Sequence, residues 1–514
     1  MKTTALVSFI FFVTIKLSAQ STYCKILKDA IEGFSIIHTN DGGFAIVGAA
    51  SDASLADVFV AKFDDQENLE WSRRYASDDV DVGLSMVEAN DGSYMITGYS
   101  EGAYTGEYII VLKLDNLGHF VWGKQIAPPY YGDGISIIAT NDGNFAVTGG
   151  YGIYYNYPDI ILLKLDGDGN TIWSKSIGGG NLSDGCSSIV QTVDNGYAIA
   201  GSSSNFGNSN GDFYLAKLDS AGDLVWDASV VRPGSDGATA LVQTSDSGLV
   251  MAGTVDEPGF SQIMVSKFNM QGSLLWSKVY GGPGPDEAFC LIKTQDEGFM
   301  IAGTTDTGFV LNSDMYLLKL AADGALQWTQ TINTALSEHG TSVIQNSDGS
   351  YIAIGWRDYP FQHGTNVIRL SSNGVCCCCQ GPWGSDTVGG ISGSGGAVVG
   401  EGPLLSDKDF TESNIGTLSD TCLATTVEQY DDEPLNNISV YTSHGFLHIL
   451  IQSPSDSKLI IEMANVVGQI ILKQEKMVDS DKPVELVYDI PDLDSGLYFL
   501  IVNNRAFPLL ISYY

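Results

Sequence analysis

Four consecutive cysteines, at positions 376 to 379, are the residues of this sequence with the most obvious chemical potential. Thiolates bind zinc, but a zinc cage usually takes its cysteines from spacings such as CxxC. In an extended strand neighbouring side chains point to opposite faces, so a run of four is poorly suited to one metal ion. We therefore expect disulfides drawn from Cys24, Cys376, Cys377, Cys378, Cys379 and Cys422. We interpret Cys186 and Cys290 as small buried apolar residues.

Acidic side chains recur at positions where they could bind a divalent cation. Asp166, Asp168 and Asn170 resemble the opening of a calcium loop, but the bidentate glutamate of an EF-hand does not follow. A second set could form a ring on one face of the molecule: Asp81, Asp184, Asp236 and Asp286, with Asp133 one position off. For both sets we favour aspartates that hydrogen-bond their own turns. We expect no cofactor, and calcium is the one alternative.

Two loops rich in tyrosine, 102–108 and 151–159, are the best candidates for binding another molecule. Tyrosine, glycine and asparagine supply adaptable contacts at recognition surfaces. The candidate binding rim consists of Tyr104, Tyr108, Tyr151, Tyr154, Tyr155 and Tyr157. The alternative is that these residues only fill solvated loops. Because no nucleophile elbow, HExxH motif, phosphate-binding loop or triad pattern occurs, we expect a protein that is not an enzyme.

A repeat of about 50 residues contains these side chains and predicts how they are positioned. Its clearest mark is a tryptophan that recurs every 50 to 53 residues, at Trp71, Trp122, Trp173, Trp226, Trp276 and Trp328. A phrase such as NDGNFAVTG occurs seven times, and its Asp-Gly pair favours a tight hairpin. Each unit predicts four strands, the third of them almost continuously apolar, as in a strand covered on both faces. Seven such units predict a seven-bladed β-propeller.

The tryptophan and the two ends of the repeat region indicate how the ring is packed and closed. Large aromatic residues contribute most buried area, so we expect the tryptophan to pack one blade against the next. Residues 23–27 resemble the strand that carries the tryptophan, and the seventh unit has Cys378 at that position. The N-terminal strand should therefore complete the last blade and remove an edge. One hypothesis is a ring-closing disulfide from Cys24 to the cysteine run.

The N-terminus and the net charge predict an exported protein. Met1-Lys2 precedes an apolar run at 5–15 and small residues before Ala19, which predicts a signal peptide over 1–19. No later segment is long and apolar enough for a transmembrane helix. The net charge is −36, from 61 acidic and 25 basic residues, which argues against nucleic-acid binding. Outside the cytoplasm the environment is oxidising, so disulfides are expected.

Two parts of the chain resemble known families. The repeat resembles the beta-propeller repeat of bacterial exported proteins over about residues 23–380, most closely in GDFYLAKLDSAGDLVW (211–226) and SLLWSKVYGGPGPD (273–286). The last stretch resembles the type A C-terminal sorting domain of the type IX secretion system of Bacteroidota. That resemblance is carried by ISVYTSHGFLHILI (438–451) and DLDSGLYFLIV (492–502), with Gly468, Ser495, Gly496, Leu497 and Tyr498 as its motif residues. It implies a small β-sandwich that routes the protein through the type IX secretion machinery and is cut off or anchored afterwards.

The segment between these two parts is rich in glycine and serine, as in GGISGSGGAVVGEG (389–402), and predicts a linker or a loosely ordered extension. We therefore expect an all-β chain with four regions: a signal peptide (1–19), a seven-bladed propeller of four-stranded blades (20–383), the linker (384–434) and a β-sandwich sorting domain (435–514). Its predicted function is secreted or cell-surface binding or adhesion to an extracellular glycan or protein. The alternatives are a polysaccharide-active or quinoprotein-like enzyme and a purely structural component of a surface assembly.

Overall fold

The structure is a computed structural model. It describes residues 22–28, 30–51, 55–102, 106–126, 130–153, 159–178, 184–205, 211–257, 259–282, 284–306, 313–332, 337–358 and 364–376, and beyond these the backbone of strands only. The predicted signal peptide and part of the C-terminal region lie outside the described residues. The chain forms two compact units, one of Tyr23–Leu423 and one of Ala424–Tyr514 with Met1–Thr22. Within the described residues no helix is long and apolar enough to cross a membrane.

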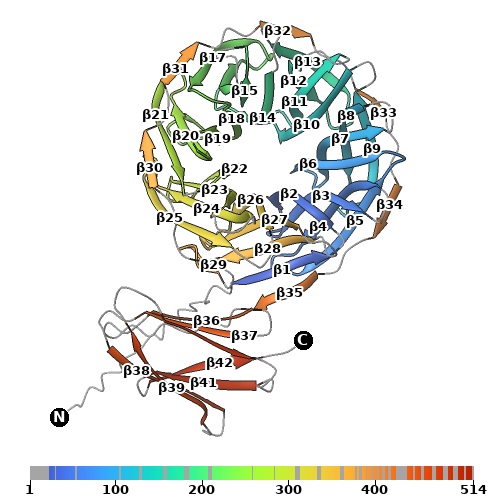
Figure 1. Cartoon of the computed structure of the whole chain (residues 1–514). Coiled ribbons are helices and arrows are strands. Elements are labelled where there is room, and N and C mark those ends of the chain that lie inside the picture. The colour runs from blue at the N-terminus through green and yellow to red at the C-terminus, as the bar shows by residue number, and fades with distance from the viewer. Residues whose placement is uncertain are drawn as a thin grey trace, which may run out of the picture. The chain divides into compact units, whose positions relative to one another are not determined.

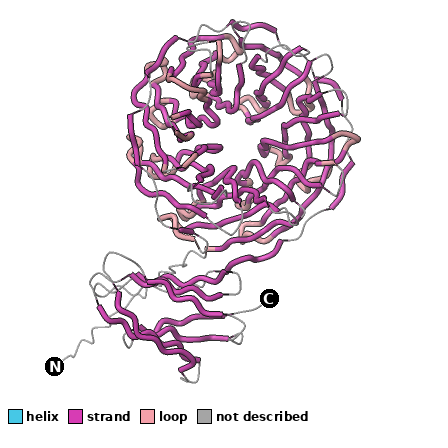
Figure 2. The backbone as a smooth tube through the Cα atoms, viewed as in Figure 1, coloured by secondary structure: helices cyan, strands magenta, loops and turns pink. Residues whose placement is uncertain are grey.

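The larger unit is a ring of seven antiparallel sheets around a central opening, as Figure 1 shows. We call the sheets blades 1 to 7 and their consecutive strands a to d, from the inside outward. Figure 2 shows that strands joined by short loops make up the described ring. The sequence prediction of a seven-bladed propeller with four-stranded repeat units is thus confirmed.

The strands of blades 1 to 3 are β2 (Ala30–His38), β3 (Phe44–Ser51), β4 (Ala56–Phe63), β5 (Leu69–Ala76), β6 (Val80–Glu88), β7 (Tyr94–Gly102), β8 (Gly106–Leu114), β9 (Phe120–Ile126), β10 (Tyr130–Ala139), β11 (Phe145–Ile153), β12 (Asp159–Leu165) and β13 (Thr171–Gly178). Those of blades 4 and 5 are β14 (Asp184–Gln191), β15 (Tyr197–Ser203), β16 (Asp212–Leu218), β17 (Leu224–Val231), β18 (Gly237–Gln243), β19 (Leu249–Asp256), β20 (Ser261–Phe268) and β21 (Leu274–Gly281). Blades 6 and 7 contain β22 (Asp286–Lys293), β23 (Phe299–Asp306), β24 (Ser313–Leu320), β25 (Leu326–Ile332), β26 (Ser337–Gln345), β27 (Tyr351–Asp358), β28 (Gly364–Leu370) and β1 (Tyr23–Lys28).

The hydrophobic core is a ring of interfaces between neighbouring blades. Strand c is buried on both faces, and every residue of β16 is buried. One cluster joins Val47 and Val60 of blade 1 to Met86 and Ile110 of blade 2. A single blade cannot cover both of its apolar faces, so burial requires the neighbouring blades.

The recurring tryptophan packs one blade against the next, as predicted. The ring of Trp71 in blade 1 lies edge-on to Tyr94 of blade 2, with 6.0 Å between centroids. It also covers Gly118 in the c–d turn of blade 2, where an added Cβ would lie 2.6 Å from the indole ring. The same contact recurs from Trp122 to Gly169 and from Trp276 to Gly324. The glycine is therefore needed for close approach as well as for its positive φ.

The Lys-Leu-Asp phrase and the Asp-Gly phrase recur together because their side chains bond to each other. In blade 1 the buried Lys62 of strand c lies 2.8 Å from Asp41 of the a–b turn. The Asp41 carboxylate also accepts hydrogen bonds from Thr39 Oγ1 and the Gly43 N–H, which closes the turn. All seven blades have this ion pair: Lys62–Asp41, Lys113–Asp91, Lys164–Asp142, Lys217–Asp194, Lys267–Asp246, Lys319–Asp296 and Arg369–Asp348.

The N-terminal strand completes blade 7, which confirms the predicted closure of the ring. The order of that sheet is β26-β27-β28-β1-β35, so β1 occupies the position of strand d. Tyr23 lies opposite Arg369, as Trp173 lies opposite Lys164 in blade 3. Tyr23, and not Cys378, is therefore the counterpart of the tryptophan.

A fifth strand covers the outer edge of every blade, and the sequence did not predict it. The seven strands are β29 (Cys379–Gln380), β30 (Ser385–Val388), β31 (Ile391–Ser394), β32 (Val398–Glu401), β33 (Leu405–Asp407), β34 (Thr411–Asn414) and β35 (Leu418–Leu423). They pair in turn with strand d of blades 6, 5, 4, 3, 2, 1 and 7, so the chain returns around the ring against its first direction. We call residues 379–423 the belt; its strands are the short arrows at the outer rim in Figure 1.

The sequence predicted a linker or loosely ordered extension at 384–434, and the described strands between Ser385 and Leu423 differ from it because each pairs with a strand d. Glycine and serine indicate flexibility in an isolated segment. Here, however, each strand d offers a row of backbone N–H and C=O groups, and pairing with them does not depend on apolar side chains. The propeller unit consequently extends to Leu423.

The smaller unit contains two antiparallel sheets. One has the order β36-β37-β40, from β36 (Asn437–Ser443), β37 (Phe446–Gln452) and β40 (Val484–Asp489). The other has the order β39-β38-β41-β42, from β38 (Ser457–Asn465), β39 (Ile470–Val478), β41 (Gly496–Val502) and β42 (Arg505–Ile511). Gly496, Leu497 and Tyr498 begin β41, whereas Gly468 and Ser495 lie outside the described residues. Side chains of this unit are also outside them, so the packing of the sheets as a sandwich stays a prediction.

Candidate functional site

The ring has two faces of different construction. Short a–b and c–d turns form one, which we call the turn face. The b–c and d–a connections form the other, the loop face. Strand a lies next to the central opening (Figure 1), so the last residues of each strand a meet around the opening on the turn face.

The predicted ring of aspartates lies at the loop face, where the carboxylates accept hydrogen bonds from backbone N–H groups. Asp81 accepts a hydrogen bond from the Ser77 N–H at 3.1 Å, and Asp286 accepts one from the Gly282 N–H at 2.7 Å. Asp236 accepts one from the Asp256 N–H at 3.0 Å. The preferred interpretation, in which each aspartate bonds its own turn, is confirmed for Asp81 and Asp286. Asp236 and Asp184 instead bond to residues at the end of strand b. Among the described residues, no group of three or more His, Cys, Asp and Glu side chains is placed to hold a metal ion.

Burial of these aspartates changes their acidity. Asp286 is fully buried and Asp236 is 3% exposed. Burial raises the pKa of each carboxyl group to about 6, and the nearby Asp212 and Asp256 charges add to the effect at Asp236. Asp133 and Glu107 show upward pKa shifts from burial as well. The loop face thus holds a set of carboxyl groups that are costly to ionise.

The calcium-like segment at 166–170 is a turn, as expected. The Asp166 side chain accepts hydrogen bonds from the N–H groups of Asp168 at 3.0 Å and Asn170 at 2.8 Å. Asp115, Asp219 and Asn269 accept the same bonds in the c–d turns of blades 2, 4 and 5. The carboxylate of Asp166 therefore closes the turn, whatever residue occupies position 168.

Only part of the predicted tyrosine rim can be located. Tyr108 is 6% exposed, and Tyr151 packs against the hydrophobic cluster around Ile161. The Tyr108 ring is buried between the blades and offers little surface to a ligand, whereas Tyr151 is partly exposed. Tyr104, Tyr154, Tyr155 and Tyr157 lie outside the described residues. The predicted rim therefore depends on Tyr151 and those four.

The cysteines divide between the blade interfaces and the closing blade. Cys186 is fully buried, with Sγ 3.4 Å from the Ala200 carbonyl oxygen, in keeping with a small core residue. Cys290 is half-buried beside Ser342. Cys24 is buried, and Cys376 is disulfide-bonded to a partner outside the described residues. The side chains of Cys377, Cys378, Cys379 and Cys422 also lie outside them.

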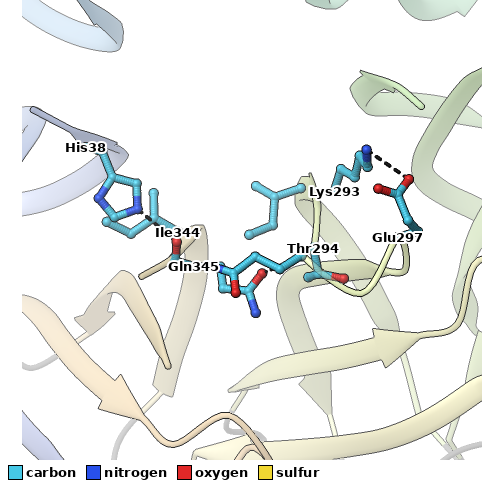
Figure 3. Close-up of a pocket in the computed structure, with 8 residues that line it drawn as sticks. His38, Lys293, Thr294, Glu297, Ile344 and Gln345 are labelled. Atoms are coloured by element: carbon cyan, nitrogen blue, oxygen red, sulfur yellow. Dashed lines mark hydrogen bonds and ion pairs between the residues drawn. The ribbon is translucent and has the colours of Figure 1, made fainter. Parts of the chain in front are cut away.

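A candidate site among the described residues is a hollow on the turn face, beside the central opening between blades 6, 7 and 1. Its volume is about 420 Å³, within the range of small-ligand sites. The residues around it come from the ends of three strands a and from one a–b turn: His38, Ile292, Lys293, Thr294, Gln295, Glu297, Ile344 and Gln345. Figure 3 shows His38 and Ile344 on one side and the Lys293–Glu297 pair on the other.

The polar groups of the hollow are held by bonds between blades. Glu297 Oε2 lies 2.9 Å from Lys293 Nζ and accepts a hydrogen bond from Ser245 Oγ of blade 5 at 2.5 Å. His38 Nε2 lies 3.0 Å from the Gln345 carbonyl oxygen. The hydrogen bonds from Ser245 and Lys293 lower the pKa of Glu297, which is therefore ionised at neutral pH. The site combines a fixed negative charge, an ammonium group and an imidazole over isoleucine side chains.

Sequence reasoning missed this hollow, although a signal for it exists. The last residue of strand a is polar in most blades: His38, Glu88, Gln191, Gln243, Lys293 and Gln345. Most of these side chains bond to the a–b turn of the preceding blade, as Gln345 Oε1 does to the Gln295 N–H at 2.8 Å, whereas His38 bonds to the Gln345 carbonyl oxygen. These polar residues link neighbouring blades on the turn face, and the Lys293–Glu297 pair borders the hollow.

Comparisons with known proteins do not identify a family. No family model matches the sequence, and no curated protein matches it. Among solved structures, Sqt1 from Chaetomium thermophilum aligns with a TM-score of 0.40 and 12% identity, covering 69% of this chain and 89% of that one. A protein of unknown function from Dyadobacter fermentans aligns with a TM-score of 0.34 and 9% identity, covering 68% and 98%. A glucose dehydrogenase aligns with a TM-score of 0.33 and 8% identity, covering 67% and 97%. These similarities carry no argument about activity.

Proposed function

We propose that this protein is an exported recognition module that binds an extracellular protein segment at the hollow on the turn face. The observation that carries the proposal is the hollow itself, with charged groups on two sides of an apolar floor. The buried Ile344 lies beside Ile292, which is half-buried and can offer apolar contact to one side chain. His38 and the Lys293–Glu297 pair can bind polar groups on either side of it.

A polypeptide is the ligand class that fits this chemistry best among the extracellular candidates. Peptide recognition commonly combines a small pocket for an apolar anchor with polar groups that fix direction. The eight residues around the hollow include no Phe, Tyr or Trp, which are the large rings that stack on sugars, and the imidazole of His38 is the one ring among them. They include one carboxylate, Glu297, whereas glycoside hydrolysis uses a pair. Binding without chemistry is therefore the function that we assign to this site.

We also propose that the chain reaches the cell surface or the medium through its two ends. The predicted signal peptide at 1–19 would direct export, and the C-terminal unit at 435–514 would engage the type IX secretion machinery. Removing residues 435–514 in the native host should leave the protein in the periplasm, as judged by fractionation. If the shortened protein still reached the medium, the proposed routing would be wrong.

Binding can be tested with the full-length protein on arrays of extracellular proteins and peptides. Glu297→Gln removes the fixed charge of the hollow, and we expect it to weaken binding by about tenfold. Glu88→Gln is the matched control, because Glu88 lies on the turn face of blade 2 and does not border the hollow. If the wild type and Glu297→Gln bound the ligand with equal affinity, the proposed site would be wrong. The loop face would then be the next candidate.

A further inference from the structure

The closing blade is built differently from the other six. Tyr23 replaces the tryptophan on strand d. Glu67, with a φ of 64°, replaces the glycine in the c–d turn of blade 1 that would receive it. Arg369 replaces the lysine and forms ion pairs with Glu67 and, at 2.7 Å, with Asp348. The boundary between blades 7 and 1 therefore lacks the tryptophan–glycine contact, and charged side chains take its place.

The belt ends on the strand that closes the ring. β1 lies between β28 and β35, so the last belt strand holds the N-terminal strand in its sheet. β35 has six residues, whereas each of the six preceding belt strands has four or fewer. The longest pairing of the belt is thus at the blade whose fourth strand comes from the far end of the sequence.

Three cysteines come together in this blade. Cys24 of β1 lies opposite Cys422 of β35, next to a shift in the pairing register between Cys24 and Lys25. Opposite residues in an antiparallel pair have Cα atoms about 4.5–5.5 Å apart, within the range of about 4.4–6.8 Å found in disulfides. Cys376 follows the turn after β28 in the same blade, is 6% exposed and is disulfide-bonded. Cys422 is the only cysteine after the cysteine run, so it alone can join the end of the belt to the ring.

We propose that Cys422 latches the belt to blade 7 through a disulfide to Cys24 or Cys376. Two thiols form one S–S bond and release two protons, and the two electrons reduce a disulfide oxidant by thiol–disulfide exchange. The disulfide closes the belt into a covalent loop around the ring. The belt strands then cannot dissociate fully from the strands d while the disulfide is intact. The inference is independent of the ligand proposed above, because the latch lies at the outer strands of blade 7, whereas the hollow borders its innermost strand, β26.

The test cuts the belt and asks whether its two ends remain joined. A specific protease site is inserted between β31 and β32 of the full-length protein, which is purified from an oxidising compartment with thiols alkylated. After cleavage, a denaturing gel without reductant should show one covalently joined species, and reductant should separate it into two fragments. Two fragments from the wild-type sequence without reductant would overturn the proposal, whatever the variants do.

Single substitutions then identify the partner of Cys422. Cys422→Ser should give two fragments without reductant. Of Cys24→Ser and Cys376→Ser, the one that also gives two fragments carries the other half of the latch. If both of these variants stayed joined, the latch would lie outside the closing blade and the assignment would be wrong. In intact protein, reductant should lower the melting temperature of the wild type by roughly 5 °C and leave that of Cys422→Ser unchanged.

Discussion

At the scale of the residue, the contact between tryptophan and glycine is the unit from which the ring is assembled. Gly118 has a φ of 79° and lies under the indole ring of Trp71. Gly143 has the same φ in an a–b turn but has no atom within 4 Å of an added Cβ. Substitution of each glycine by alanine therefore distinguishes two free-energy costs: backbone strain, which both positions share, and a clash with the indole ring, which only Gly118 has.

Gly118→Ala should destabilise the protein more than Gly143→Ala does. Both substitutions place an alanine at positive φ, which costs about 1 kcal/mol. Only the first also pushes a methyl group into Trp71, for a further loss of about 1–3 kcal/mol. Urea unfolding of the two variants beside the wild type measures the difference. Equal free energies of unfolding would show that the indole ring moves aside at no cost.

Asp236 should make stability depend on pH in an unusual direction. Its pKa is raised to about 6 in the folded protein, so its stabilising contribution is complete below about pH 4 and is lost as pH rises through 6. Asp236→Asn keeps an acceptor for the Asp256 N–H and cannot ionise. We expect this variant to be more stable than the wild type at pH 7.5 by about 1 kcal/mol and equal to it near pH 4.

Asp246 on the turn face is a control for Asp236, because its pKa is shifted in the opposite direction. Its hydrogen bond with Lys267 lowers its pKa to about 2, so its contribution is present above about pH 4 and is lost on acidification toward pH 2. Asp246→Asn should therefore lower the free energy of unfolding at neutral pH. It should also make that free energy depend less on pH during acidification toward pH 2. Thermal unfolding from pH 2 to 8 tests both variants, and parallel profiles for Asp236→Asn and the wild type would refute the first prediction.

At the scale of the element, strand a and its turn are linked from blade to blade, and one link is missing. The last residue of strand a in blade 4, Gln191, accepts a hydrogen bond from the Asn141 N–H of blade 3 at 2.8 Å. At the corresponding position of blade 3 the exposed Ala139 has no side-chain acceptor. Its partner would be the Asn90 N–H in the a–b turn of blade 2.

Ala139→Gln should supply the missing bond and stabilise the protein by about 0.5–1 kcal/mol. Ala139→Met, which has a similar length and no carbonyl acceptor, is the matched control. Denaturant unfolding measures both. A gain of the same size in the two variants would attribute the effect to side-chain packing and not to the hydrogen bond.

At the scale of the whole molecule, the belt leaves no blade with an uncovered outer strand d. A propeller protects its strand edges by radial arrangement, but the outermost strand of each blade still has unpaired backbone groups. A truncation after Leu423 keeps all seven belt strands, whereas one after Gly384 removes six of them.

We expect the chain truncated after Leu423 to remain monomeric and cooperative in thermal unfolding. The chain truncated after Gly384 should melt several degrees lower and self-associate, because strand edges pair with one another when uncovered. Light scattering and calorimetry on the two proteins provide the comparison. If the shorter chain matched the longer one in both, the belt would contribute nothing to the stability of the ring.

The sequence by itself determined the blades. The tryptophan period, the Asp-Gly turns and the apolar third strand are local patterns, and each predicts its structure without knowledge of the rest of the chain. The same holds for the completion of blade 7 by residues 23–27, because that strand repeats the pattern of strand d. The turn-closing role of Asp166 also followed, since its partners lie within four residues.

Tertiary structure alone decided the belt and the hollow. The belt has little side-chain pattern because its partners are backbone groups of seven distant strands, which do not constrain residue type. The hollow depends on how the ends of three separate strands a meet, and nothing near His38 in the sequence indicates that Lys293 and Gln345 lie beside it. Tyr108 was placed on a binding rim from composition, and burial between the blades decided otherwise. Local patterns specify strands and turns, whereas contacts between distant segments exist only once the ring has closed.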